Sequence, residues 1–379
     1  MKPHISNLKI KAFRGLENLE LSDLGLINLI VGFNNSGKSS ILEAIEYFCR
    51  PLDPLALINL SRSREVSARN FDPVQTLRWL FPKTTASLDG DFYTLEISVT
   101  GQVDDQCKTV ETILYGYLAD VYFGPAMNAD GGEQAYVPTT PPPAASSQKN
   151  GLELKCRYAE GQIPGHSVKP REAIFNITEG VPFKMHKTPE APAISCSMIT
   201  PITHRIDSLQ TRGITSVVKA DRKEDLLELL RRFDNEILDI TILDSHGYPE
   251  AWVNHHQRGF MPLSSFGDGV RRVLVIASGM SMAKGGVLLI DEIESAIHKD
   301  AYAEFFNWLY EAARFYKVQI FATTHSLEAV DAILSASLKR PDELVAFQLP
   351  DRDSKSKDIK RFSGDILESL RFDQRIDVR

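Results

Sequence analysis

Several features are scarce in this chain of 379 residues, and each scarcity excludes a class of protein. The four cysteines are scattered without a C-x-x-C pair, and the nine histidines show no metal-ligand spacing, so we expect neither a disulfide scaffold nor a zinc site. No apolar run approaches membrane-spanning length, and the N-terminus lacks the apolar core of a signal peptide. The net charge of −7 does not indicate a nucleic-acid binder. We therefore expect a cytoplasmic protein with reduced thiols and no membrane partner.

One segment carries most of the functional information. It starts at Gly32 and reads G-x-x-x-x-G-K-S, the pattern of a phosphate-binding P-loop. The apolar run 26–31 before it predicts a strand, and residues 39–48 behind it place apolar side chains on one helical face. We expect Lys38 to reach the β- and γ-phosphates and Ser39 to ligate Mg²⁺. The residues expected to contact the nucleotide are Gly32, Asn34, Asn35, Ser36, Gly37, Lys38, Ser39 and Ser40.

A second motif lies near residue 290. The apolar run 285–290 ends in Asp291 and Glu292, which is the Walker B pattern. Such a run is typical of a parallel strand buried on both faces. Asp291 would hold Mg²⁺, and Glu292 would orient and polarise the attacking water. A strand followed by an acidic helix cap is the alternative, and the P-loop in the same chain argues against it.

Two further motifs surround the acidic pair. Ser265 and Gly267 form a turn ahead of an apolar helix over 273–280, which is a second anion site of the P-loop type. Because two such sites cannot grip one γ-phosphate within a single lobe, we expect a head-to-tail dimer that encloses ATP. The strand predicted over 318–324 ends at His325, where it could hydrogen-bond the γ-phosphate. An ordinary capped helix and a structural histidine are the alternatives.

The four ordered motifs resemble those of the SMC/RecF/OLD-type ABC ATPases. The likeness is carried by residues 8–15, 28–40, 264–272, 292–298 and 322–326. It implies an α/β fold, namely an ABC-type P-loop ATPase head with a mixed sheet, an N-terminal β-rich lobe and a helical insertion. It also implies that Arg14 lies beside the nucleotide base, that Ser265 and Gly267 contact the partner subunit's γ-phosphate, and that His325 senses that phosphate.

The pattern of the whole chain suggests three parts. Residues 1–200 are expected to form an N-terminal ATPase lobe with a β-meander over 92–118 and a loop over 137–150. Residues 201–255 are expected to form a helical connector, with one helix over 220–240. Residues 256–379 are expected to form the second ATPase lobe, with an edge strand over 343–349.

The sequence departs from the family pattern in places. The signature Ser265-Phe266-Gly267-Asp268 differs from the transporter Ser-Gly-Gly-Gln, which argues against a membrane transporter. No long coiled-coil arm is present, which argues against a cohesin-like tether. Gln75, the candidate for the Q-loop glutamine, lies in poorly patterned sequence. The residues after His325 lack the spacing of a Toprim nuclease, so we expect a stand-alone relative.

Three functions fit these motifs. The first is an ATPase that dimerises around ATP, or forms a higher assembly, and regulates a separate effector in prokaryotic anti-phage defence. That effector would be a toxin or a Toprim-like nuclease. The second is a RecF-like clamp that binds DNA in repair, with a basic face built from residues 205–223. The third is a nucleotide-gated scaffold with little hydrolysis, against which the intact Asp291–Glu292 pair counts.

Overall fold

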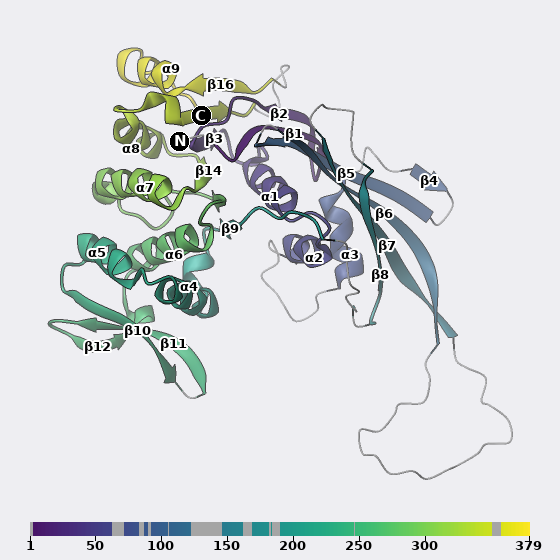
Figure 1. Cartoon of the computed structure of the whole chain (residues 1–379), viewed down its shortest axis with the longest axis horizontal. Helices are drawn as coiled ribbons and strands as arrows, with labels where there is room; N and C mark the ends of the chain where they lie inside the picture. The colour runs from purple at the N-terminus through teal and green to yellow at the C-terminus, as the bar shows by residue number, and fades with distance from the viewer. Residues whose placement is uncertain are drawn as a thin grey trace, which may run out of the picture.

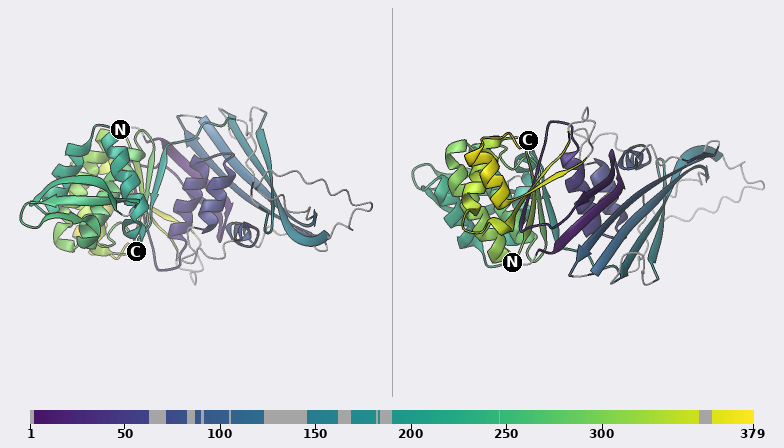
Figure 2. Two further views of the ribbon diagram at one scale, coloured as in Figure 1. Left: turned by 90° about the horizontal axis from the view of Figure 1, so that it is seen from below. Right: turned by 90° about the horizontal axis from the view of Figure 1, so that it is seen from above.

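The computed structural model describes most of the chain. The described residues are 3–62, 72–82, 87–89, 92–104, 106–122, 146–161, 169–181, 183, 190–245, 247–350 and 358–379. Their strands form three sheets, and the molecule is elongated, with a large antiparallel sheet towards one end and a helical lobe at the other (Figures 1 and 2). A central sheet lies between these two ends.

The central sheet carries the predicted nucleotide motifs. Its six strands run in the order β16-β15-β3-β14-β13-β9. Their bounds are β3 Ile27–Val31, β9 Cys196–Ile199, β13 Val287–Ile290, β14 Gln319–Thr324, β15 Leu344–Gln348 and β16 Lys360–Ser363. All pairs are parallel except β15–β16, which is antiparallel. This arrangement confirms the predicted α/β fold class with a mixed sheet.

Alternate residues of the central strands pack into two different cores. Leu29 and Val31 of β3 join the core on the side of the helical lobe, whereas Ile30 joins the core on the side of the antiparallel sheet. In β13, Leu288 faces the helical side and Leu289 the other. Because successive side chains of a strand point to opposite faces, a sheet covered on both sides requires strands that are apolar throughout.

The antiparallel sheet and three helices form one side of the molecule. Its strands run in the order β2-β1-β5-β6-β7-β8, with β4 beside β5. Their bounds are β1 Ile5–Phe13, β2 Leu16–Leu21, β4 Ser87–Asp89, β5 Phe92–Val103, β6 Gln106–Tyr122, β7 Ser146–Gly161 and β8 Arg171–Thr178. The helices between this sheet and the central one are α1 Lys38–Cys49, α2 Pro54–Arg62, α3 Pro73–Leu77 and the 3₁₀-helix η2 Arg78–Leu80 (Figure 1). The predicted meander is confirmed as β5 and β6.

The other side is a helical lobe with a small sheet. Its helices are α4 Asp207–Lys219, α5 Lys223–Phe233, α6 Asp268–Met282, α7 Tyr302–Tyr316, α8 Leu327–Ser337 and α9 Gly364–Glu368, with 3₁₀-helices η4 Thr203–Arg205, η5 Leu263–Ser265, η6 Lys299–Ala301 and η7 Pro341–Glu343 and the π-helical turn η8 Ser369–Asp373. The small sheet pairs β10 Ile237–Ser245, β11 Tyr248–His255 and β12 Gly259–Pro262. Among the described residues, no helix has the length and apolarity needed to cross a bilayer.

Three sequence-based expectations are wrong. The single helix expected over 220–240 is shorter and corresponds to α5, which ends at Phe233, because Asp234 takes extended backbone angles and Ile237 pairs with His255 in β10 and β11. The strand expected at an edge, β15, is internal because β16 pairs with its outer side. The loop expected over 137–150 lies partly outside the described residues, and 146–150 open β7 by pairing with β6.

Candidate active site

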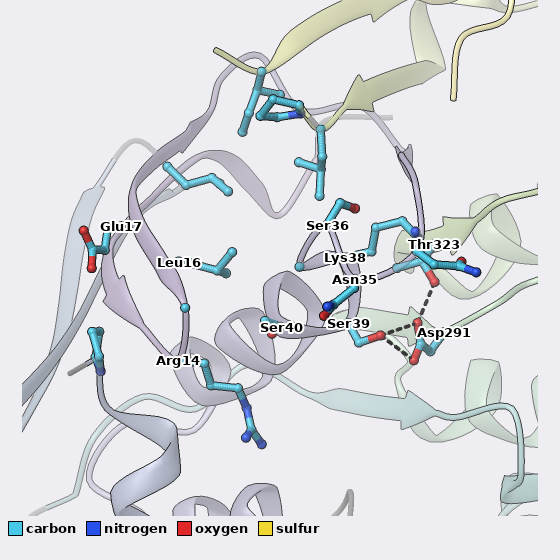
Figure 3. A pocket seen from close by; sticks show the side chains of 18 of the residues that line it. Arg14, Leu16, Glu17, Asn35, Ser36, Lys38, Ser39, Ser40, Asp291 and Thr323 are labelled. Carbon is cyan, nitrogen blue, oxygen red and sulfur yellow. Dashed lines mark hydrogen bonds between the residues drawn. The ribbon is translucent and has the colours of Figure 1, made fainter. Parts of the chain in front are cut away.

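A cavity of about 1540 Å³ opens where the P-loop follows β3 and where β13 and β14 end (Figure 3). This volume exceeds the roughly 300–1,000 Å³ of an ordinary small-molecule pocket, so it has room for a nucleotide. Carboxyl ends of parallel strands are where open α/β sheets bind ligands. The predicted residues that the structure brings together in the cavity wall are Arg14, Asn34, Asn35, Ser36, Gly37, Lys38, Ser39, Ser40, Asp291, Glu292 and His325.

The P-loop backbone has a shape that side chains would obstruct. Gly37, the residue before α1, has φ 99°, and a Cβ added to it would lie 2.9 Å from Cδ2 of Leu16. Gly32 does not line the cavity but has φ 153°, and a Cβ there would lie 3.0 Å from Oγ of Ser36. Asn35 adopts φ 65°. The loop therefore depends on its two glycines, and it leads into a helix start that exposes backbone N–H groups.

Lys38 places a cation at this helix start. Its Nζ donates to the carbonyl oxygens of Gly32 and Phe33, each at 2.7 Å. Burial lowers the pKa of Lys38 from its ordinary value, and the attraction of Asp291 and Glu292 opposes that change. No acidic residue lies in the first turn of α1. The loop can therefore supply both a side-chain cation and backbone donors to a phosphate.

Asp291 is tied to two hydroxyl groups from different elements (Figure 3). Ser39 Oγ donates to both carboxylate oxygens of Asp291, at 3.1 and 2.9 Å. Thr323 Oγ1, at the end of β14, donates to Asp291 Oδ1 at 2.6 Å. No local motif predicts a role for Thr323, and its position at the end of an apolar strand is the one signal in the sequence. The P-loop and the Walker B strand are thus joined directly through Asp291.

The turn after β13 is held from two sides. Glu292 has φ 49°, in the left-handed region where a non-glycine residue carries strain. Its main-chain N donates to Thr323 Oγ1 at 2.8 Å. Arg272 of α6, fully buried, donates to the carbonyl oxygens of Asp291 and Glu292 at 2.9 and 3.0 Å. Burial lowers the pKa of Arg272 to about 10, opposed by the carboxylates of Asp291 and Glu292. Arg272 and Thr323 therefore fix the backbone that presents the two carboxylates.

His325 and Arg14 both line the cavity, and each side chain is paired with a carboxylate. His325 Nδ1 lies 3.2 Å from Oε1 of Glu294, which also accepts from the main-chain N of His325 at 3.1 Å. Half of the His325 side chain is exposed, whereas Glu294 is buried. Arg14 has φ 52°, and its guanidinium pairs with the buried Glu43 of α1. The carboxylates of Glu294 and Glu43 thus orient two cavity side chains, and sequence analysis assigned neither of them a role.

Ser265 and Gly267 lie outside the cavity of their own chain. They sit in and after the 3₁₀-helix η5, ahead of α6. Gly267 has φ −60°, which any residue can adopt, and a Cβ added there would meet no atom of the described residues within 4 Å. Gln75 in α3 is exposed and does not line the cavity either. The internal packing of the chain therefore gives no reason for glycine at position 267.

The residues present fit a nucleotide with Mg²⁺. The Ser36 hydroxyl in the P-loop is buried and has no hydrogen-bond partner in the described part of the chain. A phosphate could satisfy it. Within the same residues, no three His, Cys, Asp or Glu side chains are grouped so that they could hold a metal alone. Mg²⁺ is commonly held by one or two carboxylates together with phosphates and water, which matches Asp291 and Ser39.

Two family descriptions match the chain. Residues 195–331 match "AAA domain, putative AbiEii toxin, Type IV TA system", and residues 1–88 match "AAA ATPase domain". An "ATP/GTP phosphatase" of Helicobacter pylori is 23% identical over 353 residues, which are 89% of each chain. These matches identify the chain as an ATPase. They are consistent with the SMC/RecF/OLD-type ABC ATPase superfamily that the motifs predict.

Other similarities are local or distant. The DNA replication and repair protein RecF of Saccharophagus degradans is 49% identical over 43 residues, 11% of this chain and 12% of that protein. The SMC head domain from Thermotoga maritima is 12% identical and covers 95% of this chain and 98% of its own, with a TM-score of 0.41. An SMC head bound to the C-winged helix domain of ScpA is 13% identical with the same coverage and a TM-score of 0.48. TM-scores below 0.5 are too low to support an inference.

Proposed function

We propose that the cavity residues perform Mg²⁺-dependent ATP hydrolysis in the roles that the motifs predict. The observation that carries this proposal is the direct bonding of Ser39 and Thr323 to Asp291, beside Lys38. Ser39 and Asp291 would hold Mg²⁺, which when bound would neutralise charge on the β- and γ-phosphates. Lys38 would bind those phosphates through its ammonium group.

Glu292 would act on the attacking water. Among the described residues its carboxylate makes no hydrogen bond or close ion pair, and it lines the cavity beside Asp291. With its backbone fixed by Thr323 and Arg272, it can accept a hydrogen bond from water and orient it for in-line attack. His325, oriented by Glu294, would donate to the γ-phosphate and respond to its loss.

We infer further that two chains close head to tail around the nucleotide. Gly267 supports this inference because the fold of its own chain does not need a glycine there, whereas a close approach by a second chain would. Ser265 and Gly267 would then contact the partner subunit's γ-phosphate. Because these residues lie away from their own cavity, they can act only on a nucleotide bound elsewhere.

We propose that this ATP-dependent dimer controls a separate effector in prokaryotic anti-phage defence. The family description over residues 195–331 names a putative AbiEii toxin of a type IV toxin–antitoxin system, which supports a place in such a system but leaves the partner to the resemblance. ATP binding and hydrolysis would change the dimer interface, and the effector would respond to that change. A Toprim-like nuclease is the effector that the resemblance suggests.

A RecF-like DNA clamp is the second candidate, favoured by the 43-residue likeness to RecF. The positive charges of its proposed basic face, residues 205–223, are partly neutralised by ion pairs within the chain. Arg205 lies 2.6 Å from Asp268, Arg222 lies 3.2 Å from Asp225, and Lys223 lies 2.6 Å from Asp239. These pairs weaken the electrostatic attraction to phosphates on which DNA binding depends, so we favour the effector model. The third candidate, a nucleotide-gated scaffold, hydrolyses little ATP and therefore would not need Glu292 to orient the attacking water.

The Glu292→Gln variant tests the enzyme and the dimer together. Removing a catalytic base lowers turnover by about 10²–10⁴-fold, while Lys38 and Ser39 still hold ATP. Light scattering with ATP and Mg²⁺ should therefore give a particle of about twice the chain mass of 42.4 kDa. Lys38→Ala should lose ATP affinity and remain monomeric. Glu311→Gln, an exposed carboxyl change on α7, should behave like the wild type.

The same variant tests the effector. Tagged Glu292→Gln protein isolated from its native host with ATP and Mg²⁺ should retain a nuclease or toxin in stoichiometric amount, identified by mass spectrometry. A bare dimer that retains DNA would instead favour the repair clamp. A monomer that hydrolyses ATP at the wild-type rate would reject both the role of Glu292 and the dimer.

A further inference from the structure

A chain of contacts leads from the P-loop to an aromatic residue with no assigned role. A Cβ on Gly37 would lie 2.9 Å from Leu16, so the start of β2 sits directly on the P-loop. Two residues before Leu16, the main-chain N of Arg14 donates to the carbonyl oxygen of Leu80 at 2.6 Å. Leu80 ends η2, and Trp79 is its neighbour in that helix. The indole therefore lies on an element fixed to the turn beside the P-loop.

Trp79 forms part of the cavity wall. The cavity that contains Lys38 and Asp291 is also lined by Trp79, Phe81 and Pro82. Phe81 is buried, whereas 53% of the Trp79 surface is exposed. The guanidinium of Arg78 lies 4.9 Å from the centre of the Trp79 ring. A large aromatic side chain that is more than half exposed at the edge of a ligand cavity is typical of a binding surface rather than of a core.

We propose that Trp79 holds the base of the bound nucleotide by stacking, and that it does so for adenine and guanine alike. This inference rests on the proposed binding of the triphosphate at Lys38 and Ser39. Stacking on an aromatic side chain tolerates any base because every base has a π-face. Leu16, Phe81 and Pro82 add apolar surface without hydrogen-bonding groups in their side chains. The ligand class of this subsite is thus the base of a nucleotide, without selection between adenine and guanine.

The assignment separates two parts of the cavity that can be tested independently. The P-loop recognises phosphates, and Trp79 would recognise only the base. Inorganic tripolyphosphate carries the first feature without the second. A change at Trp79 should therefore weaken ATP and GTP but leave tripolyphosphate unaffected, whereas a change at Lys38 should weaken all three ligands.

The experiment is calorimetric titration of the full chain with Mg²⁺ and each of ATP, GTP and tripolyphosphate. For Trp79→Ala we expect about tenfold weaker binding of both nucleotides, equal to about 1.4 kcal/mol, and unchanged binding of tripolyphosphate. Trp79→Phe, which keeps an aromatic face, should restore most of the loss. Tyr248→Ala, which removes an exposed aromatic from β11 outside the cavity, is the matched control and should bind all three ligands as the wild type does.

Fluorescence gives a second readout. The chain has three tryptophans, and neither Trp252 nor Trp308 lines the cavity. ATP and GTP should quench the wild-type emission and leave the Trp79→Phe emission unchanged. Unchanged nucleotide affinity in Trp79→Ala, equal weakening of tripolyphosphate, or a more than tenfold preference between ATP and GTP in the wild type would overturn the proposal. Failure of all three ligands to bind the wild type would instead reject the P-loop site itself.

Discussion

Two helices of this protein begin at loops of the type that receives an anion, but only one of these starts is open. At α1 the first turn holds no acidic residue, and Lys38 adds a cation. At α6 the first residue is Asp268, whose carboxylate accepts from Arg205 at 2.6 Å and from Arg271. The N-terminus of α1 therefore needs an external anion, whereas that of α6 already has an internal one.

The difference separates the tasks of the two loops. The side chains around the α1 loop come from its own chain, because Ser39, Asp291 and Thr323 are already bonded to one another. The α6 start carries two guanidinium groups against one carboxylate, and the Arg205 side chain is 64% exposed. It retains positive charge on an outer face, which is suited to an anion that a second chain brings.

The largest difference in stability is expected between two alanine substitutions, one at Gly37 before α1 and one at Gly267 before α6. Gly37→Ala forces alanine to φ 99° and towards Leu16, so we expect about 1–3 kcal/mol of lost stability together with lost ATP binding. In the part of the chain that the structure describes, the added methyl of Gly267→Ala meets no atom within 4 Å at φ −60°, so the stability of this variant should stay within about 1 kcal/mol of the wild type. Urea unfolding of both variants measures these values.

Only the second of these variants tests the dimer. If the α6 start acts on a second chain, Gly267→Ala should bind ATP normally as a monomer yet dimerise less in the Glu292→Gln background. Normal dimerisation of that double variant would show that the region around Gly267 does not face a partner. A strongly destabilised Gly267→Ala would mean that the loop is packed more tightly than its surroundings suggest.

A smaller effect is expected at the strand that completes the α1 site. Thr323→Val removes the donor to Asp291 and the acceptor for the main-chain N of Glu292. An unsatisfied buried group costs about 1–3 kcal/mol, and turnover should fall because both carboxylates lose a support. Thr324→Val is the control, because Thr324 is also buried but its hydroxyl accepts from Ser326 outside the cavity. Equal turnover in the two variants would remove Thr323 from the site.

Sequence patterns predicted those parts of the site that are contiguous in the chain. The strand, P-loop and helix around Lys38 follow one another within about twenty residues, so spacing alone specified them. The same holds for Asp291 after β13. Thr323, Arg272 and Glu294 were missed because their roles depend on distances set by strand order and helix packing. No local sequence pattern predicts that β13 pairs with β14.

The errors in the fold have the same origin. Leucines continue the helical pattern as far as Phe233, but Ile237 then joins a strand because His255 lies opposite it in β11. Residues 360–363, of which only Phe362 is apolar, look like part of a charged tail, yet they pair with Val345 and its neighbours and so place β15 between two strands. Tertiary pairing overrides local propensity at these positions, and one sequence does not reveal that pairing.

The smallest effect is expected at Asp268, the carboxylate that distinguishes the α6 start. Arg205 holds the pKa of Asp268 below its ordinary value of 3.8. A carboxyl whose pKa is lower in the folded protein stabilises it above the ordinary value, and that stabilisation is lost as the pH falls through the lowered value. Asp268→Asn should therefore be less stable than the wild type at pH 7 by under about 1 kcal/mol. This difference should shrink steadily below pH 3.8.

Urea unfolding between pH 7 and the lowest pH at which both proteins stay folded checks this shape, with Asp300→Asn as an exposed control. A difference that stays constant with pH would show that the Asp268 carboxylate is not held by charge. Because the change also frees Arg205 and Arg271 from their internal anion, it should strengthen ATP-dependent dimerisation if the α6 start receives the partner's phosphate. Weaker dimerisation in Asp268→Asn would mean that the internal carboxylate orients the two arginines and does not compete for them.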